Sequence, residues 1–463
     1  MVGRALNRLS FAGLSATLVG NGIGRFAFIA LVPALIQAGW FTKGEASHLS
    51  VATLLGYVIG AWASDFLGSR FRAAVLLRTA MLVCSLSFFA GAIEGGGMPW
   101  HYFWRTAAGF CGAILMVLPA PVLLPQHRPG IRGRASGIVF AGIGLGAVLS
   151  GLLVPVLVAG VGLAFTFGTT QVPVFEMRGV VGAWLGMGGI CLALTLFAWR
   201  QWPTEAHSHP GAALASDRTA PIPAESRLAI RLILAAHALN AIGYLTHTLF
   251  WVDYIVRELK MPLATGGFFW SVFGLGAAIG PLLTGTLADA FGLRRCLIVA
   301  FLLKAVSAAL PLLSNSLPTL FVSSLLMGVF TPGIVALVSA YTLDRVGAEH
   351  HRRAWGMATF SFAIAQAVGG FFMALAATRM DSYRPLFIVS AAALLGSLLC
   401  IAAIRATPSA NRSNPQAELP QATPTAATCE ELALPSPFGP LNAPSPASPP
   451  QRGDRLELRN IFS

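Results

Sequence analysis

Long apolar runs, separated by short polar segments, make up most of the chain. Twelve such runs follow one another, at 9–38, 48–67, 73–93, 100–124, 134–160, 179–200, 229–256, 265–288, 295–313, 317–342, 353–377 and 384–404. About 20 apolar residues cross a bilayer as a helix, and a helix satisfies its own backbone polar groups in hydrocarbon. The pattern predicts an all-α integral membrane protein with twelve transmembrane helices. No A-x-A cleavage site follows the first run, so we expect an uncleaved first helix.

Two segments do not fit a membrane. Residues 201–226 are polar and Pro-rich, and residues 406–463 are also rich in proline. Such compositions cannot bury a core. The sequence therefore predicts an N-terminal six-helix bundle (1–200), a cytoplasmic linker (201–226), a C-terminal six-helix bundle (227–405) and a disordered cytoplasmic tail (406–463).

Composition supports the membrane assignment. Of the 463 residues, 55% are hydrophobic and only 11% are charged, which is too few to cover a soluble enzyme. The formal net charge of +13 comes from basic residues dispersed between apolar runs, so we expect a lipid bilayer and no nucleic acid as partner. The six cysteines show no metal-ligand spacing, and neither a metal nor a cofactor is expected.

The distribution of basic residues predicts the orientation. With twelve spans, 21 Lys and Arg fall on the side of the two termini and 6 on the opposite side. Cytoplasmic segments carry the excess of Lys and Arg. Both termini are therefore expected in the cytoplasm.

The two groups of six helices share an internal repeat. The sequence NGIG at 21–24 recurs as NAIG at 240–243, and RASG at 134–137 recurs as RAWG at 353–356, both at an offset of 219 residues. Gly109 and Gly328 have the same offset. This series predicts two pseudo-symmetric bundles, with a substrate site between them near the bilayer midplane.

Two loops carry related motifs that place an acid at a helix end, a glycine for a tight turn and an arginine at the next helix. They read AWASDFLGSRFR at 61–72 and GTLADAFGLRR at 285–295. Both resemble the G-x-x-x-D-[RK]-x-G-[RK]-[RK] loop signature of the major facilitator superfamily. The resemblance implies contacts that hold one gate state and release in the other, made by Asp65, Gly68, Arg70, Asp289, Gly292 and Arg294.

Further motifs resemble the same superfamily. RTAAGFCGA at 105–113 is similar to its R-x-x-x-G-x-x-[AG]-A pattern, which is associated with substrate or proton handling. GIGRFA at 22–27 with Pro33, followed by LGYVIG at 55–60, is similar to the uncharacterised bacterial YbfB/YjiJ-like branch. The resemblance implies a secondary transporter in a bacterial inner membrane, with helices 1, 4, 7 and 10 lining the cavity. It supplies no substrate.

Ionisable residues at membrane depth are the candidate functional groups, because each costs at least about 2.5 to 3.5 kcal/mol on insertion scales. Arg25 lies near the middle of the first run and is expected to face a water-filled cavity. For Arg105, reaching the membrane surface is an equal alternative to function. We interpret Arg78 and Lys304 as lying nearer the cytoplasmic ends of their helices and reaching the surface.

The seventh run carries a polar stripe. Helical spacing places His237, Asn240, Tyr244 and His247 on one face, and their counterparts at the 219 offset are Leu18, Asn21, Arg25 and Phe28. The resemblance places both stripes in the cavity. The expected substrate-cavity residues are Asn21, Arg25, Phe28, Arg105, Asn240, Tyr244 and His247.

No Asp or Glu lies deep in any apolar run. The titratable candidates for carrying a coupling proton are therefore His247, His237 and, near the outer mouth, Asp253. Histidine titrates nearest to neutral pH. A structural hydrogen-bonding role is the alternative for each histidine.

These observations favour a monomeric secondary transporter that moves a small anionic or carboxylate-bearing solute by alternating access, with protons as a candidate coupling ion. The alternatives are a non-transporting membrane sensor and an integral membrane enzyme. We expect no enzyme and assign no catalytic residue, because no nucleophile motif, metal spacing or P-loop is found.

Overall fold

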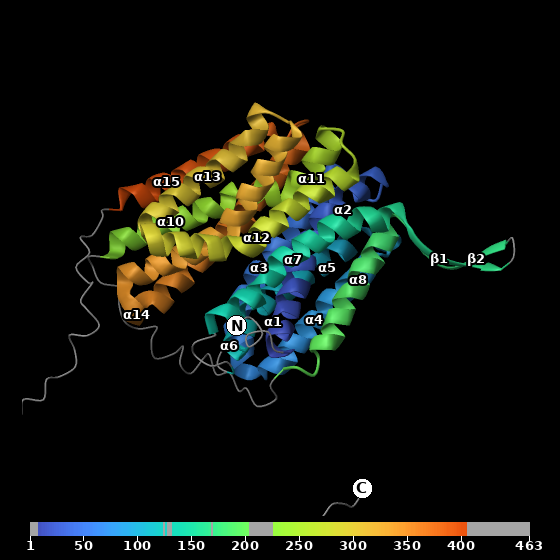
Figure 1. Cartoon of the computed structure of the whole chain (residues 1–463), viewed down its shortest axis with the longest axis horizontal. Helices are drawn as coiled ribbons and strands as arrows, with labels where there is room; N and C mark the ends of the chain where they lie inside the picture. Colours follow the sequence, from blue (N-terminus) through green and yellow to red (C-terminus); the bar gives the residue numbers. More distant parts are fainter. Residues whose placement is uncertain (1–7, 124–125, 127–131, 168–169, 203–225, 405–463) are drawn as a thin grey trace, which may run out of the picture. The chain divides into compact units, whose positions relative to one another are not determined.

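A computed structural model describes residues 8–123, 126, 132–167, 170–202 and 226–404 (Figure 1). The chain divides into two compact units, Met1–Ala406 and Thr407–Ser463. All described residues belong to the first unit. The expected tail, 406–463, lies outside the described residues, as does the linker prediction apart from residues 201, 202 and 226.

The helices of the first half follow the order expected from the apolar runs. They are α1 (Arg8–Thr17), η2 (Leu18–Ile23), α2 (Phe26–Gln37), α3 (Lys43–Arg70), α4 (Ala73–Gly91), η3 (Glu94–Gly96), α5 (Gly97–Val117), α6 (Pro119–Leu123), α7 (Arg132–Ala159) and α8 (Gly179–Ala198). The first three form one interrupted span, because η2 is a π-helical segment and a turn at Gly24 and Arg25 separates it from α2.

The second half repeats this plan. Its elements are α10 (Arg227–Gly243), η7 (Thr246–Phe250), α11 (Trp251–Asp253), η8 (Tyr254–Glu258), α12 (Leu263–Phe291), α13 (Leu293–Leu313), α14 (Leu317–Arg379) and α15 (Arg384–Ala403). The span from α10 to η8 is also interrupted, and the interruption is at Tyr244.

Eleven helical segments in the described residues are long and apolar enough to cross a membrane. The remaining expected span is α5, a helix of 21 residues that includes polar side chains such as His101 and Arg105. Together they form the twelve-helix architecture predicted from the sequence.

The longest helical run, α14, contains two spans, Leu317–Val346 and Arg353–Arg379. A straight helix of 63 residues would be about 95 Å long. However, the guanidinium of Arg384, just after α14, donates a hydrogen bond to the carbonyl of Leu312, just before it, at 2.6 Å. The run therefore folds back on itself, and its two spans are antiparallel.

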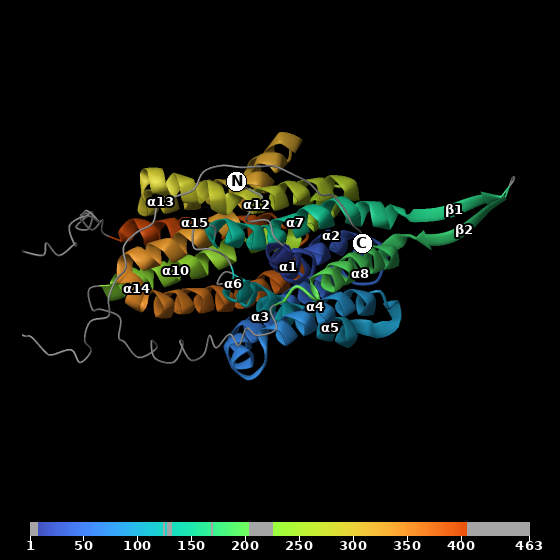
Figure 2. The same ribbon diagram turned by 60° about the horizontal axis from the view of Figure 1, so that its bottom comes forward.

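A β-hairpin joins α7 to α8 and was not predicted. Strands β1 (Val161–Phe167) and β2 (Thr170–Met177) pair antiparallel, from Val161 opposite Met177 to Phe167 opposite Thr170. Figure 2 shows the hairpin extending beyond the ends of α7 and α8. It adds a small two-stranded sheet to the helical fold.

Glycines allow equivalent helix pairs to approach closely in both halves. A Cβ on Gly56 would lie 2.0 Å from a backbone oxygen of α5, and one on Gly280 would lie 2.1 Å from a backbone oxygen of α14. The reciprocal distances are 2.0 Å for Gly109 of α5 and 2.1 Å for Gly328 of α14. Gly109 and Gly328 belong to the sequence repeat, and their partners Gly56 and Gly280 are 224 positions apart in the two halves. The repeat therefore corresponds to the same packing in each half.

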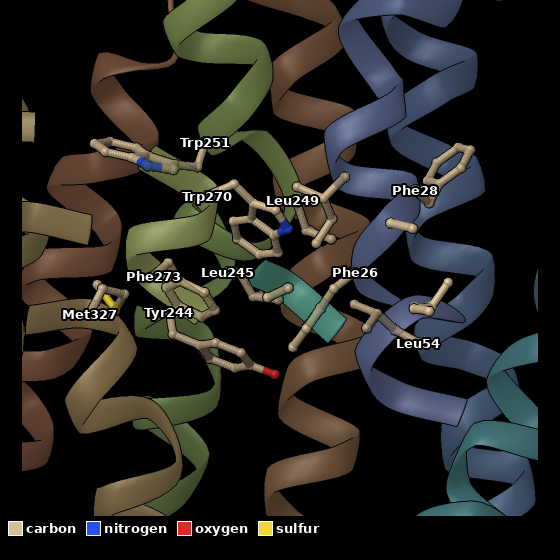
Figure 3. Packing of buried hydrophobic residues seen from close by; sticks show 14 of the residues in the cluster. Phe26, Phe28, Leu54, Tyr244, Leu245, Leu249, Trp251, Trp270, Phe273 and Met327 are labelled. Carbon is tan, nitrogen blue, oxygen red and sulfur yellow. The ribbon is translucent and has the colours of Figure 1, made fainter. Parts of the chain in front are cut away.

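The two halves meet through small residues and aromatic rings. Gly144 and Gly151 of α7 lie against the backbone of α12, where a side chain at either position would not fit. Phe26 of the first half packs edge-on against Trp270 of α12, with ring centroids 5.4 Å apart (Figure 3). The rings of Trp270 and Phe273 stack at 4.7 Å. Tyr244 and Leu245 belong to the same buried cluster (Figure 3).

Candidate functional site

The centre of the site is a hydrogen bond between the two interrupted spans. Arg25 donates from Nη2 to the hydroxyl of Tyr244 at 2.9 Å. The two residues are 219 positions apart, which is the offset of the repeat, and each follows the glycine that ends its NGIG or NAIG motif. Equivalent positions of two pseudo-symmetric halves touch only near the axis that relates them. Arg25 and Tyr244 therefore lie at the centre of the molecule.

A third helix joins this contact. The Tyr244 hydroxyl donates a short hydrogen bond to Oε1 of Gln366 in α14. Gln366 is buried, and the Tyr244 ring also stacks on Phe362 of the same helix at 5.7 Å. Gln366 was not predicted from the sequence, because an uncharged amide in an apolar run gives no signal of its own.

Two predicted residues, Asn21 and Arg105, form hydrogen bonds next to the turn that interrupts the first span. Asn21 donates to the carbonyl of Gly112 in α5 at 2.8 Å. Arg105, also from α5, donates to the carbonyl of Gly24 at 3.0 Å, and its guanidinium carbon lies 4.2 Å from the centre of the Phe28 ring. Arg105 is only 5% exposed, so it does not reach the membrane surface. Its Nε has no hydrogen-bond partner among the described residues.

The expectation for Lys304 is wrong. This residue of α13 is 0% exposed, and its ammonium donates to Oδ1 of Asn240 at 2.9 Å. The same Nζ lies 5.2 Å from the centre of the Tyr244 ring. Lys304 is the twelfth of 21 residues in α13, so each surface is about 15 Å away along the helix, and the packing faces it inward. Arg78, in contrast, is partly exposed and donates to the carbonyl of Trp199 at 2.7 Å.

The turn at Tyr244 and the π-helical η7 interrupt the seventh span within the predicted polar stripe. His237 packs against the ring of Phe362 at 4.7 Å. His247 lies 2.9 Å from the hydroxyl of Ser323 and stacks on Trp251 at 4.3 Å. Both histidines are buried, and Nδ1 of each has no hydrogen-bond partner among the described residues.

A second polar cluster joins the halves at the end of the bundle that we call the Tyr383 end, defined by Lys43, Asp253, Arg257, Glu258 and Tyr383. Lys43 of the first half donates to the carbonyl of Met380 at 2.9 Å and lies 4.2 Å from the centre of the Tyr383 ring. The Tyr383 hydroxyl donates to buried Asp253, which forms an ion pair with Arg257 at 3.1 Å. Glu258 accepts from the backbone N–H of Tyr383 at 2.7 Å. Asp253 is thus part of this cluster rather than free.

The two loop motifs have different geometries. Gly292 has φ of 87° in the turn between α12 and α13. Arg294 donates to the carbonyls of Ile404 and Ala402 at the end of α15, at 3.0 and 2.7 Å. Asp289 is exposed at the end of α12. In the first motif, Gly68 lies inside α3, which continues to Arg70, so the expected tight turn at Gly68 is wrong. Asp65 also lies within α3, three residues before Gly68.

The site contains cations without matching acids. Within the part of the chain that the structure describes, no carboxylate lies within ion-pair distance of Arg25, Arg105 or Lys304. The described residues also contain no group of three or more His, Cys, Asp or Glu that could hold a metal ion. The central arrangement offers hydrogen-bond donors and positive charge.

Comparisons with known proteins agree with this architecture. The family model described as "Uncharacterised MFS-type transporter YbfB" matches residues 17–402. The fold is similar to the crystal structure of a point mutant of the nucleoside transporter NupG, with a TM-score of 0.66 and 11% identity over 86% of this chain and 99% of that one. It is also similar to a bacterial homologue of the human lysosomal transporter Spinster in an inward-facing and occupied conformation, with a TM-score of 0.59 and 16% identity over 85% and 93% of the two chains. No curated protein matches the sequence.

Proposed function

Because this chain belongs to the family of the uncharacterised MFS-type transporter YbfB and is a multi-pass membrane transporter, we propose that it moves a small anionic or carboxylate-bearing solute by alternating access. The observation that carries this proposal is Arg25. Its guanidinium lies at the break of the first span, at the interface of the two halves, and faces a tyrosine instead of an acid.

A guanidinium without a carboxylate partner favours the binding of a negatively charged solute. The bond to Tyr244 uses one of its five N–H donors, and the planar group can present two parallel donors to a carboxylate. A charge at membrane depth without a partner is costly. An anionic solute that binds there removes part of that cost, whereas a neutral or cationic solute does not.

The contacts between the two halves, one at Arg25 and Tyr244 and one at the Tyr383 end, support alternating access. At the centre, Arg25 and Tyr244 join the halves, and at the Tyr383 end Lys43 bonds across the same interface. We place the Tyr383 end outside the cell and both termini in the cytoplasm of a bacterial inner membrane, on the basis of the Lys and Arg distribution. In this orientation the structure corresponds to a state closed toward the outside. We propose that the transporter works as a monomer.

Protons are the proposed coupling ion, with His237, His247 and Asp253 as candidate carriers. Asp253 binds Tyr383 and Arg257 at the Tyr383 end, so a change in its protonation acts directly on that cluster. His247 is the candidate closer in sequence to Tyr244, but its ring faces Ser323 and Trp251. The test measures solute flux in proteoliposomes with and without an imposed pH gradient. The variants are His237→Gln, His247→Gln and Asp253→Asn. The variant whose flux no longer responds to the pH gradient identifies the proton carrier.

A screen of metabolites and toxicants can identify the substrate by comparing the growth of a deletion strain with that of an overexpressing strain. The flux of each candidate solute is then measured in proteoliposomes. Arg25→Ala is expected to reduce flux of the identified anion at least tenfold, and Arg25→Lys to retain part of it. Arg78→Ala is the matched control, because it removes a helix arginine outside the site. Full transport by Arg25→Ala would refute the anion site. Binding without flux would identify a sensor instead.

A further inference from the structure

We propose that Lys304 and Arg25 together form a two-cation site for a solute with two separate acidic groups, such as a dicarboxylate. This inference rests on the proposed function and narrows its substrate class. The two cations come from opposite halves and both lie against Tyr244. Arg25 binds the Tyr244 hydroxyl at 2.9 Å, and the Lys304 ammonium lies 5.2 Å from the centre of the Tyr244 ring.

The hydrogen bonding of Lys304 is incomplete. An ammonium has three donors, and the one hydrogen bond formed by Lys304 among the described residues goes to Oδ1 of Asn240 at 2.9 Å. Asn240 is itself 1% exposed, and its Nδ2 has no hydrogen-bond partner in the same part of the chain. Buried polar groups are normally satisfied, so these remaining donors are available to an acceptor on a bound solute. Lys304 and Asn240 therefore present unused donors beside the Tyr244 ring.

Each of the two cations that lie against Tyr244 calls for a negative group. A buried charge is stable only when it is paired, and removal of one partner of a buried pair is strongly destabilising. No described carboxylate pairs with Lys304 or with Arg25. A solute with one acidic group neutralises one of the two cations and leaves the other uncompensated. A solute with an acidic group at each end neutralises both and bridges the two halves.

The test measures binding to the detergent-purified full-length protein from ligand-induced shifts of its unfolding temperature. The probes are three diacids, succinate, adipate and suberate, and the three straight-chain monoacids with the same numbers of carbons. At least one diacid is expected to bind at least tenfold more tightly than its monoacid. In Lys304→Met this preference is expected to fall below twofold, and in Arg25→Gln both classes are expected to bind at least tenfold more weakly.

A second variant keeps the test independent of the folding of Lys304→Met. Asn240→Asp places a carboxylate on the ammonium of Lys304, so the protein itself neutralises the second cation, and the diacid preference is expected to disappear while monoacid binding remains. Arg78→Met is the matched control and is expected to keep the preference. If no diacid binds more tightly than its monoacid, or if Lys304→Met and Asn240→Asp retain the preference, the two-cation site is refuted. Monoacid binding that depends on Arg25 would then still support the proposed function, whereas loss of all acid binding would refute both.

Discussion

Removal of a single hydroxyl at the centre of the molecule tests whether the Arg25 contact stabilises one state of the transport cycle. Tyr244→Phe deletes the group that accepts from Arg25 and donates to Gln366. The ring contact with Phe362 at 5.7 Å is retained, because phenylalanine keeps the aromatic ring. The substitution therefore changes hydrogen bonding and leaves the apolar packing intact.

The size of the effect follows from the two bonds. The bond to Gln366 joins two elements of the same half, so its loss acts similarly on both states of the cycle. The bond from Arg25 crosses between the halves and involves a charged donor, for which the net contribution is about 1.5 to 3 kcal/mol. An equilibrium between a state with this bond and one without it is expected to shift by about ten- to hundredfold.

Distances between spin labels measure this shift. Ala38→Cys and Asp381→Cys are both exposed and lie in opposite halves near the Tyr383 end, while most native cysteines are buried. In Tyr244→Phe the distance distribution is expected to gain a longer component, because the state closed at that end is less favoured. The matched control is Tyr341→Phe. Its hydroxyl also accepts from an arginine, Arg345, at 2.7 Å, but both residues lie in α14.

The control separates conformational equilibrium from general stability. Tyr341→Phe is expected to lower the unfolding temperature without changing the distance distribution. If Tyr244→Phe leaves the distribution unchanged, or if Tyr341→Phe changes it equally, the central bond does not stabilise this state of the cycle.

Three further predictions concern packing and the Tyr383 end. Gly56→Val is expected to destabilise the protein by at least about 2 kcal/mol in thermal unfolding, because even its Cβ would lie 2.0 Å from a backbone oxygen. Gly356→Ala is the control, because a Cβ at Gly356 has open space around it. An equally large effect of Gly356→Ala would contradict this reasoning. Lys43→Met is expected to lengthen the distance between the labels at positions 38 and 381, because it removes the partly exposed hydrogen bond to the Met380 carbonyl, worth about 1 kcal/mol. An unchanged distance distribution would show that Lys43 does not help to close the Tyr383 end. Asp253→Asn is expected to destabilise by about 2 kcal/mol, because Arg257 loses its ion pair, and exposed Asp381→Asn should have no comparable effect.

The sequence predicted the parts of the fold that depend on composition along the chain. A bilayer imposes a minimum apolar length on every span, so the number and order of the helices followed from hydropathy. The repeat predicted the pseudo-symmetry, and its glycines form the same close helix contacts in both halves. The hairpin between α7 and α8 was missed, because its strands lie outside the apolar spans on which the prediction depended.

The sequence indicated some residues of the candidate site, such as Arg25 and Tyr244, but not how they are arranged. Arg25 was identified because a charge in the middle of a span requires a partner or water. Lys304 is equally central in α13, and its position along the helix was the available signal. Its orientation toward Asn240 depends on how α13 packs, which hydropathy does not encode. The contact of Gln366 with Tyr244 and the contacts of His247 with Ser323 and Trp251 likewise depend on tertiary packing.

The contact between Arg25 and Tyr244 has a consequence for the history of the chain. A duplicated gene begins with the same residue in both copies, and residues on the axis of a duplicated protein face their own copies. Two arginines there would set like charges against each other, at a cost of about 4 kcal/mol for a 4 Å separation and an effective dielectric constant of 20. Two tyrosines would bring no charge to the centre. The present bond could form only after the copies diverged at this position, so the ancestral pair must have had a different central contact.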